Sequence, residues 1–293
     1  MDPWSDVERS IREASGTPFY IESRSTVGGG CINESHVLRG AGHAYFVKLN
    51  APERLEMFAA EAAGLEEIAK SGTVRVPRPL CHGACPAASW IVLEHLDLQP
   101  ATAGCMGELG RRLAGMHRIT APRHGWRRDN TIGATRQVNT PSPDWADFWR
   151  ERRLGFQLRL AEENGHGGRL LAEGERLLGK LPVFFRGHYP APSLLHGDLW
   201  AGNAAATAAG EPVIFDPAVY YGDREADIAM TELFGGFPRS FYESYRAEYA
   251  LDAGYAIRRD LYNLYHVLNH LNLFGGGYRA QAERIIGQLL AQV

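Results

Sequence analysis

The sequence has little lysine, little cysteine and no long apolar run. Its 4 cysteines are too few for a disulfide framework in a chain of 293 residues. No apolar stretch approaches the roughly 20 residues that cross a bilayer. The N-terminal segment carries acidic residues where a secretory signal would be basic and then apolar. We therefore expect a cytoplasmic protein with no membrane partner.

Basic residues are numerous but do not cluster, and nearly all of them are arginines. The net charge is -3, and no basic run or ladder of basic and aromatic residues occurs, so we expect no nucleic-acid partner. Lysine occurs only at Lys48, Lys70 and Lys180, which makes any lysine inside a motif conspicuous. The pair Cys81 and Cys85 lacks a second pair at zinc-ribbon spacing, so we expect ordinary packing or loop residues there. Whether the protein is a monomer or a dimer does not follow from these features.

The first third of the chain has the periodicity of a small sheet. A helical apolar pattern over 4–14 precedes strand-like segments at 18–27, 35–40 and 44–49, with glycine-rich turns between them. A helix is expected at 53–70 and a buried strand at 89–98. The length permits two lobes, and we place an N-terminal lobe at 1–96 and a C-terminal lobe at 97–293. The first lobe is then an antiparallel sheet with one main helix.

The remainder of the chain is predominantly helical in pattern. Residues 120–145, between the helices expected at 105–119 and 144–165, are rich in Pro, Gly, Asn and Trp, which predicts an ordered loop. This order of elements predicts an α+β fold. Helices are expected at 105–119, 144–165, 168–180, 224–234, 239–250 and 256–273.

A glycine run and a strand lysine together indicate a phosphate site. Gly28, Gly29 and Gly30, followed by Cys31, lie between two expected strands, where glycine lets backbone N–H groups approach phosphate oxygens. A plain hairpin turn is the alternative. Lys48 lies on the next strand, and in a kinase-like fold a helix glutamate orients the lysine at this place. Glu61, thirteen residues further on in the expected helix, has the right spacing, whereas a solvated edge lysine is the alternative for Lys48.

The segment "LLHGDLWAGN" and the following "VIFDP" supply the remaining groups for phosphoryl transfer. Asp198 is a candidate base for an acceptor hydroxyl, and Asn203 and Asp216 are candidate ligands of Mg²⁺. The interval from Asp198 to Asn203 equals that of the protein-kinase H-R-D-x-x-x-x-N loop. The alternative, an ordinary turn with an asparagine, is reasonable for each of these features separately. It does not explain why the glycine run, Lys48, Glu61, the Asp198–Asn203 loop and Asp216 occur together in this order.

Several segments resemble the fructosamine kinase family, also called ketosamine-3-kinases, over about residues 5 to 290. They include "HGDLWAGN", "GDREADIAMTELFGGFP" and "LYHVLNHLNLFGGGY". The resemblance implies a two-lobed protein-kinase-like fold of the aminoglycoside-phosphotransferase type, with ATP and Mg²⁺ between the lobes. It also implies phosphorylation of the 3-hydroxyl of a small-molecule or protein-bound ketosamine, which leads to deglycation. The rival hypotheses are a kinase of this fold for an aminoglycoside, choline or a similar acceptor, and a catalytically dead nucleotide-binding scaffold.

Further residues complete the predicted site. Trp200 either contacts the acceptor or packs under the catalytic loop, and Asp129 and Asn130 either line the acceptor pocket or cap their own loop. The backbone of Glu94, His95 and Leu96 is expected to meet adenine at a hinge, with the Glu94 side chain solvated. His196 and Asp227 are expected to support the catalytic loop, Asp227 by accepting backbone hydrogen bonds.

A few positions carry narrower expectations. Asp223 stands where the family more often has His, and Ala201 stands where Ser is usual, so we expect altered local hydrogen bonding with activity kept. His266 and His270 have a spacing that can bind metal, but helix packing and hydrogen bonding are favoured. A thiol beside a phosphate-binding turn can have a lowered pKa, and we hypothesise that oxidation of Cys31 regulates ATP binding.

Overall fold

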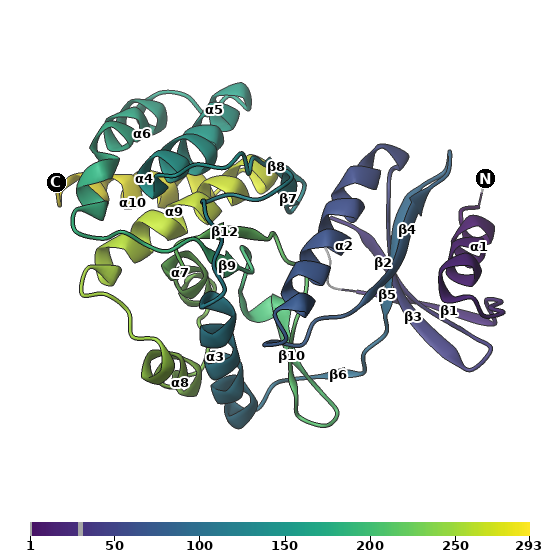
Figure 1. Ribbon diagram of the computed structural model, residues 1–293. Coiled ribbons are helices and arrows are strands. Elements are labelled where there is room, and N and C mark those ends of the chain that lie inside the picture. The colour runs from purple at the N-terminus through teal and green to yellow at the C-terminus, as the bar shows by residue number, and fades with distance from the viewer. Residues whose placement is uncertain (1, 29–31) are drawn as a thin grey trace.

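The computed structural model describes residues 2–28 and 32–293, and it has a sheet at the N-terminal end and a mostly helical remainder (Figure 1). The sheet has the strand order β1-β2-β3-β5-β4, and every neighbouring pair is antiparallel. These strands and their helices are α1 (Trp4–Ser15), β1 (Ser23–Val27), β2 (Glu34–Gly40), β3 (His43–Asn50), α2 (Leu55–Lys70), β4 (Pro79–Ala84) and β5 (Ser89–Glu94).

The two faces of this sheet pack against different helices. Val47 and Leu49 of β3 pack in a cluster with Val7 and Ile11 of α1. Since successive side chains of a strand point to opposite faces, Lys48 faces the other way, toward α2. Figure 1 shows α2 between the sheet and the C-terminal part. Strand alternation alone therefore points Lys48 toward the junction of the two parts.

The C-terminal part is built of helices and several short strands. Its elements are β6 (Leu98–Gln99), α3 (Ala103–His117), β7 (Asn130–Ile132), β8 (Thr135–Gln137), α4 (Trp145–Phe148), a π-helical segment (Trp149–Leu154), α5 (Gly155–Glu163), α6 (Arg169–Lys180), β9 (Ser193–Leu195), β10 (Ala204–Thr207), β11 (Pro212–Ile214), β12 (Tyr220–Gly222), α7 (Glu225–Leu233), α8 (Arg239–Glu248), α9 (Tyr255–Phe274) and α10 (Tyr278–Leu290). Short 3₁₀ turns lie at Pro52–Arg54, Leu181–Phe185 and Ala201–Asn203.

Short antiparallel pairings position the chain segments that carry the predicted chemistry. β9 pairs with β12, and β10 lies between β11 and β6. The amide of Ile214 on β11 also donates to the carbonyl of Arg75, which joins this region to the chain between α2 and β4. Two loops, one after β9 and one after β11, are thus held beside the N-terminal sheet.

The α+β class and the predicted helices are confirmed, with some corrections. The helix expected at 144–165 contains the π-helical segment, where the buried Arg153 guanidinium lies 4.1 Å from the ring centre of Tyr220 and donates to the Val138 carbonyl at 2.7 Å. The first strand begins at Ser23 instead of residue 18. β4, α10 and the β7–β8 hairpin were not predicted. β4 is an edge strand with a proline and a glycine and therefore lacks a clear alternation.

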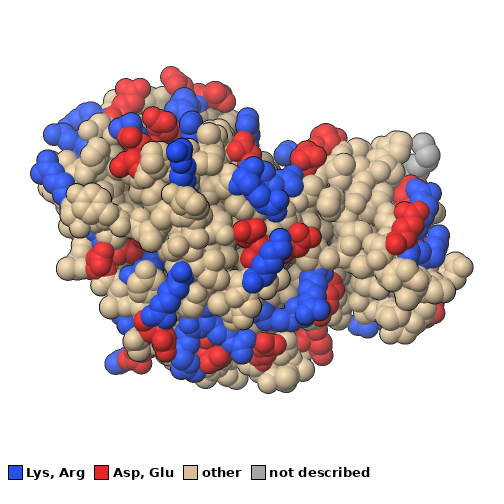
Figure 2. Space-filling model, in the orientation of Figure 1, with Lys and Arg blue, Asp and Glu red and all other residues tan. Residues whose placement is uncertain are grey.

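The outer surface carries mixed charge on the face that Figure 2 shows, with Lys and Arg interspersed among Asp and Glu. Within the described residues, no helix combines the length and the apolarity that crossing a bilayer requires.

Candidate active site

The turn from His196 to Asp198 follows β9 directly. Gly197 has a φ of +83°, and a Cβ there would lie 2.1 Å from the carbonyl oxygen of Ala218, so only glycine fits. The amide of Asp198 donates to Nδ1 of His196 at 3.2 Å, so the ring proton is on Nε2, which donates to the Phe215 carbonyl at 3.0 Å. Burial lowers the pKa of His196 and favours this neutral form. The histidine thereby ties the turn to the segment that follows β11.

Asp227 lies beneath this turn, near the start of α7. Its two carboxylate oxygens accept hydrogen bonds from the amides of His196 at 2.7 Å and Gly197 at 2.8 Å, and His117 Nε2 lies 3.1 Å away. Burial by itself would raise the pKa of Asp227, but the hydrogen bond from His117 and the neighbouring donors lower it. A buried carboxylate therefore fixes the backbone that carries Asp198, in the arrangement expected from the sequence.

Asp198 and Asn203 are joined within the same loop. Nδ2 of Asn203 donates to the Asp198 carbonyl at 2.9 Å, and the amide of Phe215 donates to the Asn203 carbonyl at 3.1 Å. Among the hydrogen bonds of the described residues, Oδ1 of Asn203 takes part in none. Burial raises the pKa of Asp198 to about 7, and the nearby carboxylates of Asp216 and Asp227 contribute. The loop thus presents a carboxyl that exchanges its proton near neutral pH, beside an unused amide oxygen.

Lys48 connects three elements. Its Nζ donates to Glu61 on α2 at 2.6 Å and to Asp216 after β11 at 2.5 Å. Burial tends to lower the pKa of Lys48, but the carboxylates of Asp216 and Glu61 outweigh it and raise the pKa. The ammonium therefore remains charged. Asp216 has the left-handed φ of +58°, and its side chain is 46% exposed, so this carboxylate also opens toward solvent.

Gly28 follows the edge strand β1, and the predicted hinge follows β5. Gly28 is exposed, whereas Gly29, Gly30 and Cys31 lie outside the described residues. Glu94 ends β5, and its carboxylate accepts from Arg75 at 2.5 Å and from the Arg78 amide at 3.2 Å. The Glu94 side chain is therefore paired as well as partly solvated, since it is 35% exposed. Over residues 2–28 and 32–293, the backbone N–H and C=O groups of His95 and Leu96 have no protein partner.

Trp200 lies between Asp198 and Asn203 and is 38% exposed. A Cβ at Gly202 would lie 2.4 Å from the indole, so the missing side chain at Gly202 makes room for the ring. The indole packs edge-on against Phe234, with ring centres 6.2 Å apart. The ring thus packs against its own loop at Gly202 and against Phe234 and keeps one part open to solvent, and its contact with the acceptor stays a prediction.

His266, for which the sequence favoured helix packing over metal binding, lies beside the catalytic loop. Its Nδ1 lies 3.9 Å from Oδ1 of Asp198, while His270 donates from Nδ1 to the His266 carbonyl at 2.8 Å. Within the described residues, the two histidines belong to no cluster of metal-ligating groups. The spacing on the helix was visible in the sequence, but nothing there indicated that α9 passes beside the turn after β9.

Comparison with known proteins identifies the family to which this geometry belongs. The model of the fructosamine kinase family matches residues 3–292. This chain belongs to the fructosamine kinase family. A protein of Synechocystis named a probable ketoamine kinase is 46% identical over 289 residues, which are 98% of this chain and 97% of the relative. The chloroplastic protein-ribulosamine 3-kinase of Arabidopsis thaliana is 45% identical over 290 residues, covering 97% of this chain and 88% of the relative.

Solved structures agree with membership of the fructosamine kinase family. A fructosamine-3-kinase candidate from Haemophilus somnus superposes with a TM-score of 0.91 at 29% identity, covering 98% of this chain and 97% of that one. An aminoglycoside phosphotransferase shares the fold with a TM-score of 0.63 at 14% identity, covering 97% of this chain and 98% of that one. The predicted kinase-like fold is therefore confirmed, and the protein is an ATP-dependent phosphotransferase.

Two predicted acceptor residues of this fructosamine kinase family member bond mainly to residues of their own loop. Oδ1 of Asn130 accepts from Gln137 and Asn139, both at 2.8 Å, and its Nδ2 donates to the Val219 carbonyl at 2.8 Å. Asp129 accepts from the Asn139 amide at 2.9 Å and pairs with an arginine of β8. The contacts therefore match the loop-capping alternative, and they correct the assignment of Asn130 to the acceptor pocket.

Asp223 is the more consequential of the two departures from the family pattern. It is buried, and Oδ2 lies 2.6 Å from Nε2 of His188 and 2.5 Å from the hydroxyl of Tyr262. The bond to Tyr262 holds the start of α7 against α9. Ala201 begins the 3₁₀ turn and is exposed.

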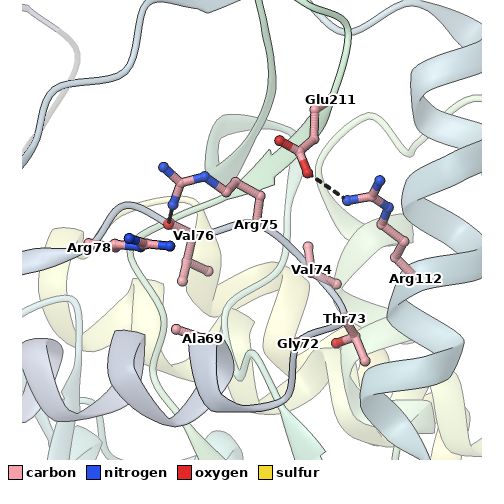
Figure 3. A pocket seen from close by; sticks show the side chains of 9 residues that line it. All are labelled: Ala69, Gly72, Thr73, Val74, Arg75, Val76, Arg78, Arg112 and Glu211. Atoms are coloured by element: carbon pink, nitrogen blue, oxygen red, sulfur yellow. Dashed lines mark hydrogen bonds and ion pairs between the residues drawn. The ribbon is translucent and has the colours of Figure 1, made fainter.

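A separate hollow of about 190 Å³ lies between the α2–β4 connection, α3 and the β10–β11 turn (Figure 3). Its arginines are largely paired: Arg112 donates to Glu211 at 2.9 Å, and Arg75 donates to Glu94. None of the predicted site residues lines this hollow.

Proposed function

We propose that this protein transfers the γ-phosphoryl group of ATP to the 3-hydroxyl of a ketosamine, in particular a ribulosamine or fructosamine adduct of an amine or protein lysine. The observation that carries the proposal is the contact set of Lys48 with Glu61 and Asp216, beside a fixed loop that bears Asp198 and Asn203. The relatives named ketoamine kinase and protein-ribulosamine 3-kinase support the choice of acceptor. Phosphorylation makes such an adduct unstable, so its loss amounts to deglycation.

Asp198 acts on the acceptor hydroxyl. Because its loop is fixed by Asp227, the carboxylate orients the hydroxyl toward the phosphate and takes its proton late in a loose transition state. The raised pKa of Asp198, about 7, suits a group that must hold this proton and then release it near neutral pH. Trp200 borders the same turn and contacts the acceptor.

The nucleotide lies on the side of the N-terminal sheet. Lys48 contributes a fixed positive charge to the phosphates, and Glu61 holds the ammonium in place. The free backbone groups of His95 and Leu96, together with Glu94 at the strand end, form the adenine-binding hinge. Gly28, Gly29, Gly30 and Cys31 remain the predicted phosphate-binding residues.

Mg²⁺ fits the donor set beside Asp198. Magnesium prefers oxygen ligands, and the uncommitted Oδ1 of Asn203 and the half-exposed carboxylate of Asp216 are of that kind. When bound there, Mg²⁺ would neutralise charge on the phosphates. Lys48 pairs with Asp216 in this structure, and its contact with Glu61 would hold the ammonium if Asp216 were a ligand of the cation.

Other predictions remain proposals. The boundary between the lobes at residues 96 and 97 falls between β5 and β6, and a cytoplasmic location follows from the sequence composition alone.

The test incubates the protein with Mg-ATP and, separately, ribuloselysine, fructoselysine and an aminoglycoside, and follows phosphorylated product by mass spectrometry. We expect transfer to the ketosamines. Asp198→Asn should lower transfer by at least about 100-fold, because it removes the base, while ATP binding is kept. Asp147→Asn, on the surface of α4, is the matched control and should behave as wild type. Transfer to the aminoglycoside alone, or no transfer with ATP still bound, would contradict the proposal.

A further inference from the structure

One face of α9 forms a row that begins at the catalytic loop. His266, His270 and Phe274 are four residues apart, so they lie along the same side of the helix. Their exposure rises along the row: His266 is 4% exposed, His270 is partly exposed and Phe274 is 50% exposed. Eight residues of helix span about 12 Å. The row therefore leads from the protein interior to its surface.

The inner end of the row lies at Asp198. Nδ1 of His266 is 3.9 Å from Oδ1 of Asp198, beyond hydrogen-bond distance, and within the described part of the chain it has no hydrogen-bond partner. A buried polar atom without a partner is costly, because it loses water without gaining a replacement. This nitrogen, 3.9 Å from the proposed base, is therefore a candidate contact for an oxygen of the acceptor.

Aromatic rings line the rest of the row. The ring of His270 lies 4.8 Å from that of Phe234, 5.5 Å from that of Phe274 and 5.2 Å from that of Tyr278, all measured between centres. Phe234 in turn contacts the partly exposed Trp200. The outer part of the row is therefore continuous, through Phe234, with the indole that borders Asp198.

We infer that this row of α9, with Trp200 and Phe234 beside it, binds the amine side of the acceptor and determines which adducts are used. The inference rests on the proposed function. The sugar oxygen next to the reacting hydroxyl bonds to His266, and the amine substituent extends over His270 and Phe274 to the surface. A lysine stem of four methylenes is apolar and suits an aromatic surface, and the cationic amine is attracted to aromatic faces. The peptide backbone stays outside.

The decisive experiment compares two acceptors that share one sugar, the ribulose adducts of methylamine and of Nα-acetyl-lysine amide. Phe274→Ala should raise KM for the lysine adduct about five- to tenfold with kcat unchanged, because it removes binding that is equal in the ground and transition states. KM for the methylamine adduct should change less than about twofold. Ile257→Ala, a similarly exposed apolar residue at the other end of α9, is the matched control and should leave both acceptors unaffected.

A second arm tests the inner end of the row. His266→Leu should lower kcat/KM for both adducts by a similar factor of about ten, since both place the same sugar at Asp198. His266→Asn, whose amide reaches the position of Nδ1, should restore much of the loss. If His266→Leu does not fold, the comparison of Phe274→Ala with Ile257→Ala decides alone. Wild-type transfer to both adducts, with Phe274→Ala indistinguishable from the control, would overturn the inference and leave the proposed function intact. Failure of the wild type on both adducts would overturn the proposed function itself.

Discussion

Replacing Asp227 by Asn tests whether a buried carboxylate holds the catalytic loop. Asp227 is 1% exposed, and its oxygens accept from the amides of His196 and Gly197 and contact His117. An asparagine keeps one acceptor oxygen, so its NH₂ group must face at least one of these donors. In the less disruptive orientation, the amide of Gly197 is left buried without an acceptor.

The magnitude follows from these contacts. A buried donor without a partner costs about 1–3 kcal/mol, and hydrogen bonds to a charged acceptor are worth about 1.5–3 kcal/mol each against about 1 for neutral pairs. We therefore expect Asp227→Asn to lower the free energy of unfolding by roughly 2–4 kcal/mol. Transfer activity should fall as well, because Asp198 is carried by the same turn, whereas ATP binding should persist.

Two measurements check this prediction. Denaturant unfolding gives the change in stability, and hydrogen exchange reports the amides of His196 and Gly197, which should exchange faster than in wild type. Asp147→Asn removes a carboxylate whose side chain is 52% exposed and should change stability by less than about 0.5 kcal/mol. Unchanged exchange at the two amides, together with wild-type stability of Asp227→Asn, would refute the anchoring role.

Three further predictions follow from the same geometry. Gly197→Ala should destabilise the protein and impair transfer far more than Gly210→Ala. A Cβ at Gly197 would lie 2.1 Å from the Ala218 carbonyl oxygen, whereas Gly210 has a similar φ of +79° but open space around it. Unfolding curves of the two variants, measured side by side, check this. Gly202→Ala should displace the Trp200 indole and raise KM for the ketosamine but not for ATP, and equal changes in both would contradict it. Burial lowers the pKa of His124 to about 4, so only the unfolded chain takes up this proton as pH falls below about 6.5, and stability is lost between that pH and about 4. Between pH 7 and pH 5, His124→Phe should therefore lose roughly 2 kcal/mol less of its free energy of unfolding than wild type does. A wild-type pH dependence of unfolding in this variant would contradict the role given to His124.

The spacing of chemical groups could be predicted because it is a local property. Asp198 and Asn203 belong to one turn, and Lys48 and Glu61 belong to a strand and the helix that follows it. The β7–β8 hairpin could not be predicted in this way, because it is held by Asn130, Gln137 and Asn139 bonding to one another and to a carbonyl near β12. Those partners are brought together only when the C-terminal part folds.

By itself, the sequence determined the order of sheet and helices, the motif that carries Asp198 and the family resemblance, since each depends on neighbours along the chain. The tertiary structure decided that Glu94 pairs with Arg75, that Asn130 donates to the Val219 carbonyl and that His266 lies beside Asp198. These pairs join residues far apart in the sequence. Their contacts depend on how helices and loops pack, which periodicity and spacing do not encode.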